Sequence, residues 1–114
     1  MKHSPGFLAI VEDAKSGVTE MTVEEYGKLK ESGEAHVLVD VREDNEWNSA
    51  HATGAVHLGK GIIERDIENT VPDKDARIVL YCGGGYRSIL AASALMKMGY
   101  RNPVSLAGGW RAWN

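Results

Sequence analysis

The sequence predicts an α/β domain in which helices cover both faces of a parallel sheet. Short apolar runs rich in β-branched residues alternate along the chain with segments of helical spacing. The runs at residues 36–41 and 77–81 are almost unbroken, as is typical of strands buried on both faces of a parallel sheet. A chain of 114 residues is the length of one domain, which buries roughly two thirds of its unfolded surface.

The first predicted element is an amphipathic helix over residues 5–15. Its apolar residues recur at helical spacing, with Ser4 as the expected N-cap and Pro5 in the first turn. The helix is expected to end near Gly17, and packing on the domain is favoured over binding of a partner. We therefore divide the chain into an N-terminal helical extension, residues 1–17, and a domain over residues 18–114.

The domain is expected to begin with a short strand over residues 18–21 and a capped helix. Thr22 and Glu25 have the spacing of a capping box, in which each side chain accepts a hydrogen bond from the other residue's backbone N–H. The helix that they open is expected to run to about Ser32 and to stop at Gly33.

The next elements are predicted to be shorter. After the strand at residues 36–41, Asp44 is expected to cap a short helix, and residues 55–58 form a brief strand. Residues 61–68 have a weak helical pattern, and residues 71–75 are expected to form a loop.

The last third of the chain repeats the strand–helix alternation. Residues 77–81 form a strand, and residues 88–98 form an alanine-rich helix with Gly99 as its C-cap. A final strand at residues 104–106 and a terminal helix at residues 109–114 complete the chain. The predicted order is therefore that of a parallel α/β sheet, whose ligands bind beyond the carboxyl ends of the strands.

The chemistry is expected at Cys82, the single cysteine, where the strand over residues 77–81 ends. Three glycines, Tyr86 and Arg87 follow, and then a helix begins. This turn directs backbone N–H groups and the positive end of the helix dipole to one point, where a thiol is expected to ionise readily. A lone cysteine is also often an inert core residue, but its position at the strand–helix junction favours a nucleophile.

Composition excludes several classes of function. The net charge of −3 gives no reason to expect nucleic acid or an anionic membrane as partner. No apolar run reaches the ~18 residues of a membrane span, and residues 1–5 lack the pattern of a signal peptide. A single cysteine forms no internal disulfide and works in a reducing compartment, so we expect the cytoplasm. The four histidines are scattered, so no metal or other cofactor is implied.

Four separate segments, in the right order, resemble the signatures of a single-domain rhodanese, a sulfurtransferase-type domain. They are residues 39–43 followed by Glu46 and Trp47, residues 50–58, the loop at residues 82–88, and residues 106–110 with Trp113. Residues 7–15 are also similar to the leader of a rhodanese subgroup.

The resemblance implies a five-stranded parallel sheet and a sulfurtransferase of the thiosulfate type. Cys82 would take a sulfane sulfur from a donor such as thiosulfate or a persulfide, and pass it to a thiol or cyanide. The implied partners are small sulfur donors, thiol acceptors and a persulfidated protein. Residues expected to bind the persulfide through their amides are those of the loop after Cys82: Gly83, Gly84, Gly85, Tyr86, Arg87 and Ser88. We expect Gly84 and Gly85 to adopt left-handed backbone conformations.

Asp40 and Arg42 are further candidates for the site. Asp40 either orients the loop through hydrogen bonds or caps the end of its strand. Arg42 either lines the mouth of the site or forms an ion pair with Glu43 or Glu46, and we favour the ion pair. Sulfur transfer needs no histidine base, so His51 and His57 are expected to pack and to form hydrogen bonds.

The chain departs from the family pattern in two places. Ala50, Ala52 and Thr53 replace the usual Gly, Ile and Pro, which affects packing and turn geometry more than chemistry. The three glycines after Cys82 include no cation, and Arg87 is the only charge in the loop. A persulfide donor is therefore as plausible as thiosulfate.

Two other functions remain open from the sequence. Cysteine phosphatases that resemble rhodanese have five residues between cysteine and arginine, whereas here four separate Cys82 from Arg87, so phosphate is not expected to fit. The serious alternative is a sulfur carrier, or a regulatory rhodanese-like binding module, that does not turn over. A carrier and an enzyme would use the same Cys82 persulfide, and the sequence does not separate them.

Overall fold

The computed structural model describes residues 3–113 and contains a five-stranded sheet in which every strand pairing is parallel. The predicted fold class is thereby confirmed. In sheet order the strands are β1 (Thr19–Met21), β5 (Asn102–Leu106), β4 (Arg77–Tyr81), β2 (Val37–Asp40) and β3 (Val56–His57). The strand that leads to Cys82, β4, is therefore central, and its carboxyl end lies between the ends of β2 and β5.

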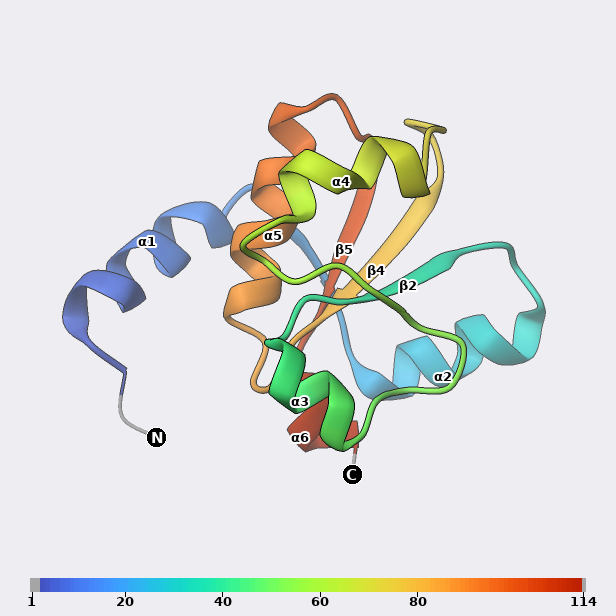
Figure 1. Ribbon diagram of the computed structural model, residues 1–114, viewed down its shortest axis with the longest axis horizontal. Coiled ribbons are helices and arrows are strands. Elements are labelled where there is room, and N and C mark those ends of the chain that lie inside the picture. Colours follow the sequence, from blue (N-terminus) through green and yellow to red (C-terminus); the bar gives the residue numbers. More distant parts are fainter. Residues whose placement is uncertain (1–2, 114) are drawn as a thin grey trace.

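Helices cover both faces of this sheet (Figure 1). One face is covered by α4 (Ile63–Thr70) and α5 (Arg87–Lys97), and the other by α2 (Val23–Ser32) and α6 (Gly109–Trp113).

Two shorter or outlying helices complete the fold. The short α3 (Asp44–Ser49) lines a small cavity together with Trp110 of α6. Helix α1 (Pro5–Lys15) packs against α5 (Figure 1). Within residues 3–113 no helix combines the length and the apolar character needed to cross a membrane.

Two apolar cores result from the alternation of side chains along the strands. On β4, Ile78 and Leu80 belong to the core under α4 and α5, whereas Val79 and Tyr81 belong to the core under α2 and α6. All four are fully buried. Burial on both faces thus explains the nearly unbroken apolar pattern of this strand. The strand ends at Tyr81, directly before Cys82.

Most helix and strand ends differ from the prediction by one or two residues, and those of α1, α2 and β4 agree with it. The capping box of Thr22 and Glu25 is present, and Gly33 ends α2 in a left-handed conformation. The expected cap of α3 is wrong. Asp44 is the first helical residue, and Glu43 is the N-cap, which forms a capping box with Glu46.

The start of α6 is packed directly on the backbone that follows β4. The amide of Trp110 donates a hydrogen bond to the carbonyl oxygen of Cys82 (2.7 Å), and the amide of Arg111 donates one to that of Gly83 (3.0 Å). Gly109 is left-handed at φ 55°, and a Cβ there would overlap with the Cys82 carbonyl oxygen. The last helix therefore clamps the backbone of the cysteine, and it does so through a contact that only glycine permits.

We predict that Gly109→Ala destabilises the domain much more than Gly33→Ala. Both glycines are left-handed, which costs a residue with a Cβ about 1–2 kcal/mol, but Gly33 has no atom within 4 Å of its Cβ position. The alanine at position 109 must in addition displace the Cys82 backbone. Free energies of unfolding from urea titrations measure the difference, and equal losses in the two variants would contradict the clamp.

Candidate active site

The sulfur of Cys82 is surrounded by hydrogen-bond donors. Its Sγ accepts hydrogen bonds from the backbone N–H of Gly85 (3.1 Å) and of Ser88 (3.4 Å), and the Ser88 Oγ lies 3.5 Å away. Cys82 has no exposed surface. These groups provide hydrogen bonds to a sulfur that has no contact with water.

The loop conformation that directs these amides depends on one left-handed glycine. Gly85 has φ 99°, and a Cβ at this residue would lie 3.0 Å from the amide nitrogen of Gly108. The expectation of a left-handed Gly84 is wrong. Gly84 does not have a positive φ, and a Cβ there would meet only the Arg111 side chain, at 3.6 Å.

A second serine, which sequence reasoning missed, supports the first. The Ser105 Oγ on β5 lies 2.8 Å from the Ser88 Oγ, and both residues are fully buried. When the sulfur is a thiolate, the Ser88 hydroxyl has to donate to it, and the Ser105 hydroxyl can then donate to Ser88. The only sequence signal for Ser105 was a polar residue within an apolar strand.

Arg87 is held by an acidic residue from α3. Its two terminal nitrogens lie 2.8 and 3.2 Å from the two carboxylate oxygens of Glu46. The hydrogen bond from Arg87 is the main reason why the pKa of Glu46 falls to about 2. The same bond raises the pKa of Arg87, to which the nearby Cys82 adds an electrostatic contribution. The charge of Arg87 is thus largely neutralised within the protein, and its role is to fasten the loop to α3.

Asp40 and Arg42 form a buried ion pair with each other. Arg42 donates to both carboxylate oxygens of Asp40, and its backbone N–H donates to one of them (2.8 Å). Arg42 also donates to the Ala50 carbonyl oxygen, and its guanidinium lies near the rings of Tyr81 and Trp110. The partner of Arg42 is therefore Asp40, so the expected pairing with Glu43 or Glu46 is wrong. Asp40 caps the end of β2, and neither member of the pair lines the cavity beside Cys82.

His51 and His57, which lie within the motif segment at residues 50–58, pack against other residues and form hydrogen bonds, as expected. Both rings stack on Trp47, with centroids at 3.4 Å for His51 and 4.9 Å for His57. A nitrogen of His51 lies 3.0 Å from the Trp47 carbonyl oxygen, and one of His57 lies 2.8 Å from that of Arg42. Neither ring lines the cavity that contains the cysteine.

A cavity of about 550 Å³ borders Cys82. Tyr86 stands at its rim and is 38% exposed. Two further contributions to the cavity were missed in the sequence: Arg111 from α6, and His3 and Phe7 from the N-terminal segment. Since Cys82 itself is fully buried, a molecule in the cavity can contact the sulfur only if neighbouring atoms move.

Comparison with known proteins identifies relatives of the same fold. The rhodanese-like domain model matches residues 22–114. The chain is 35% identical over 80 residues to the thiosulfate sulfurtransferase GlpE of Pseudomonas entomophila (strain L48). This match covers 70% of this chain and 72% of GlpE. It is 32% identical over 98 residues to YrkF of Bacillus subtilis (strain 168), which has the provisional name of a sulfur carrier protein. That match covers 86% of this chain but only 52% of YrkF, so the chain spans about half the length of that relative.

Among solved structures, RPA3614 from Rhodopseudomonas palustris CGA009, described as a possible tyrosine phosphatase, has a TM-score of 0.87 and 28% identity. The match covers 99% of this chain and 92% of RPA3614. The fold, the family model and the shared sequence thus agree. The chain belongs to the rhodanese-like domain family.

Proposed function

We propose that this chain is a sulfurtransferase that carries a sulfane sulfur on Cys82. The convergence of hydrogen bonds from Gly85 and Ser88 on the cysteine sulfur is the observation that supports this function. Such donors favour a sulfur anion over a neutral thiol, because hydrogen bonds to a charged acceptor are the stronger ones. Both forms that sulfur transfer requires, the thiolate and the persulfide, are anions.

The reaction consists of two displacements at sulfur. The Cys82 thiolate attacks the outer sulfur of thiosulfate or of a persulfide, the donor's sulfur–sulfur bond breaks, and sulfite or a thiolate leaves with the electron pair. The resulting Cys82 persulfide is then attacked at its outer sulfur by a thiolate or cyanide, and the Cys82 thiolate is the leaving group. Neither step needs a proton donor. The protein contributes a covalent intermediate and preorganised donors for its charge.

Arg87 and Ser105 act on this chemistry through the loop. The ion pair of Arg87 with Glu46 holds the first residue of α5 against α3, and this position fixes the Ser88 amide that follows. Ser105 orients the Ser88 hydroxyl from β5. Both are positioning residues, which keep the donors on the sulfur during transfer.

A sulfur carrier and a phosphatase are the two alternative functions, and the experiment described below distinguishes both from a sulfurtransferase. The name of YrkF favours a sulfur carrier, which would form the Cys82 persulfide and transfer it to one protein without turnover on small acceptors. The description of RPA3614 raises a phosphatase, but only four residues separate Cys82 from Arg87, and that arginine is already paired with Glu46. A free cysteine nucleophile persists best in a reducing compartment, so the cytoplasm is the proposed location.

We predict that thiosulfate or a small persulfide adds the mass of one sulfur atom to the wild-type protein, and that Cys82→Ser gains none. Serine keeps the acceptor for the Gly85 amide, so the variant should fold with an unchanged circular dichroism spectrum. Thiocyanate release in the presence of cyanide measures turnover. Persulfide formation without turnover would identify the carrier, and hydrolysis of an aryl phosphate without persulfide would identify the phosphatase. Sulfur transfer by the serine variant would contradict the proposal.

We predict that Gly85→Ala slows persulfide formation by about tenfold or more, whereas Gly84→Ala has little effect. The first change places a Cβ at a left-handed residue against the Gly108 amide, and strain of this kind costs ~1–3 kcal/mol and turns the amide from the sulfur. The second change creates an ordinary contact with a flexible arginine. Rates from mass spectrometry, with melting temperatures as control, test this pair. Equal rates in the two variants would show that the Gly85 amide does not hold the sulfur.

We predict a pH dependence of stability from the ion pair between Glu46 and Arg87. The pKa of Glu46 is lowered from 4.5 to about 2 in the folded state. The pair therefore stabilises the fold fully above the unfolded pKa, and its contribution is lost as the pH falls from 4.5 towards 2. The stability difference between the wild type and Glu46→Gln should be constant above about pH 5.5 and shrink below it. Urea unfolding across pH measures it.

Glu31→Gln is the control for this pH series. Glu31 is exposed on α2 and makes no ion pair within residues 3–113, so its replacement should have little effect at any pH. A stability difference for Glu46→Gln that stays the same at low pH would contradict the ion pair.

A further inference from the structure

We propose that residues outside the cysteine loop select the sulfur donor, and that they favour an anionic donor with an aromatic body over thiosulfate. The selecting residues are Arg111 from α6 and the aromatic rim, formed by His3, Phe7 and Tyr86. This inference deepens the sulfurtransferase function proposed above and rests on it. The donor class is an organic thiosulfonate, in which a ring is attached to the sulfonyl group that carries the sulfane sulfur.

Arg111 supplies the cationic part of this site. Its backbone amide is bound to the Gly83 carbonyl oxygen, and its guanidinium lies over the loop, 3.6 Å from the Cβ position of Gly84. In the part of the chain that the structure describes, Arg111 forms no ion pair with an acidic side chain. Arg87, the other arginine of the cavity, is neutralised by Glu46. The charge available to a bound anion is therefore that of Arg111.

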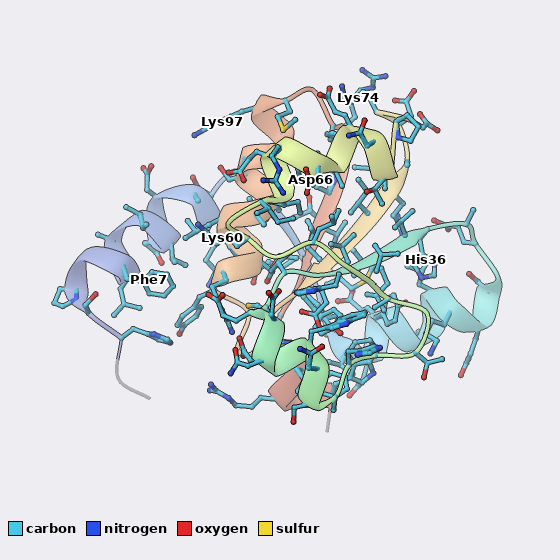
Figure 2. The ribbon with its side chains drawn as sticks, viewed as in Figure 1. Phe7, His36, Lys60, Asp66, Lys74 and Lys97 are labelled. Carbon is cyan, nitrogen blue, oxygen red and sulfur yellow. The ribbon has the colours of Figure 1, made fainter. Side chains whose placement is uncertain are left out.

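The aromatic rim stands in the same cavity as Arg111 and Cys82. The ring of His3 lies 4.9 Å from that of Tyr86 and 5.2 Å from that of Phe7, measured between centroids. Phe7 and Tyr86 are 6.3 Å apart, so the three rings form one cluster from segments distant in the sequence. In Figure 2 the Phe7 side chain lies between α1 and the rest of the domain.

The rim is held in place by the packing of its helix. The buried Val11 of α1 is 4% exposed, and α1 packs against α5, which begins directly after Tyr86. Aromatic side chains favour edge-to-face and offset contacts with other rings at centroid distances of about 4.5–7 Å. A ring of the donor can therefore extend this cluster in the cavity.

The size of the cavity also favours a donor larger than thiosulfate. About 550 Å³ lies within the range of roughly 300–1,000 Å³ that is typical of small-molecule sites. Thiosulfate is an ion of a few atoms and leaves most of this volume unused. A thiosulfonate brings its sulfonyl oxygens to Arg111 and its ring to the rim while the sulfane sulfur faces Cys82.

The transfer step is balanced with this donor. The Cys82 thiolate attacks the terminal sulfur of the thiosulfonate anion, and a bond forms between the two sulfurs. The bond from the terminal sulfur to the sulfonyl sulfur breaks, and the sulfinate anion leaves with its electron pair. Two anions enter and two anions result, so the step needs no proton, oxidant or reductant.

The test compares kcat/KM for benzenethiosulfonate, methanethiosulfonate and thiosulfate, with cyanide as acceptor and thiocyanate as product. We expect the wild type to prefer the aryl donor to the methyl donor by about tenfold or more, a ratio within reach of a ring contact in a pocket. Phe7→Ala should lower this ratio by about tenfold, and Phe7→Leu, which keeps apolar bulk, should lower it less.

Replacement of Arg111 should lower kcat/KM for every anionic sulfur donor. Arg111→Gln is expected to lower kcat/KM for the three donors by about tenfold, since each presents its negative charge next to the sulfane sulfur. The controls are Ile10→Ala, at an exposed position of α1, and Lys97→Gln, at the far end of α5 (Figure 2). Neither control residue lines the cavity, so both variants should keep the wild-type ratio and rates.

A binding measurement separates failure of this inference from failure of the proposed function. Benzenesulfonate lacks the sulfane sulfur, and its affinity for the Cys82→Ser protein can be measured by calorimetry. Affinity that Phe7→Ala and Arg111→Gln each weaken by about tenfold supports the inference even if no donor is turned over. Equal affinity in all variants, or equal wild-type kcat/KM for aryl and methyl donors, overturns it while sulfur transfer itself stands.

Discussion

The structure is built around a sulfur that has no contact with water and that must carry a negative charge if the proposed sulfur transfer is right. A buried anion is costly unless the protein supplies hydrogen bonds in place of those from water. Here the Gly85 and Ser88 amides and the Ser88 hydroxyl take that place. Each depends on a different element: the left-handed turn after β4, the first turn of α5, and Ser105 on β5. The central position of β4 brings these elements to one point.

The two arginines of the cavity differ in their roles: Arg87 fastens the cysteine loop to α3, whereas Arg111 is the residue proposed to bind an anionic donor. Arg87 belongs to the loop, yet its guanidinium is consumed by the ion pair with Glu46, which ties α5 to α3. Arg111 belongs to α6, whose first turn is bound to the backbone of Cys82 and Gly83. Arg111 can therefore bind an anion without breaking the ion pair between Arg87 and Glu46 that holds the loop. The absence of cations from the glycine turn therefore does not leave the site without one.

Local patterns explain what could be predicted, and tertiary contacts explain the rest. The apolar run of β4 and the capping box of Thr22 depend only on residues close together in the sequence, and the structure contains both as expected. The pairing of Glu46 with Arg87 joins residues 41 positions apart, and that of Ser88 with Ser105 depends on strand order. Neither has a local signature. The choice between Gly84 and Gly85 failed for the same reason, because no local pattern distinguishes the two glycines, whereas in the structure only Gly85 of the two is left-handed and lies against the Gly108 backbone.

The boundary of the family match runs between two groups of residues that line the cavity. The match begins at residue 22, so β4, the loop and α6 lie inside it, whereas α1 and the residues before it lie outside. His3 and Phe7 nevertheless line the cavity beside Cys82 and contact Tyr86. Among residues 3–113, the hydrogen bonds to the Cys82 sulfur all come from residues inside the match. The N-terminal segment thus contributes to the wall of the cavity but forms none of these hydrogen bonds to the sulfur. The proposed preference for an aromatic sulfur donor therefore depends on residues that the family match does not include.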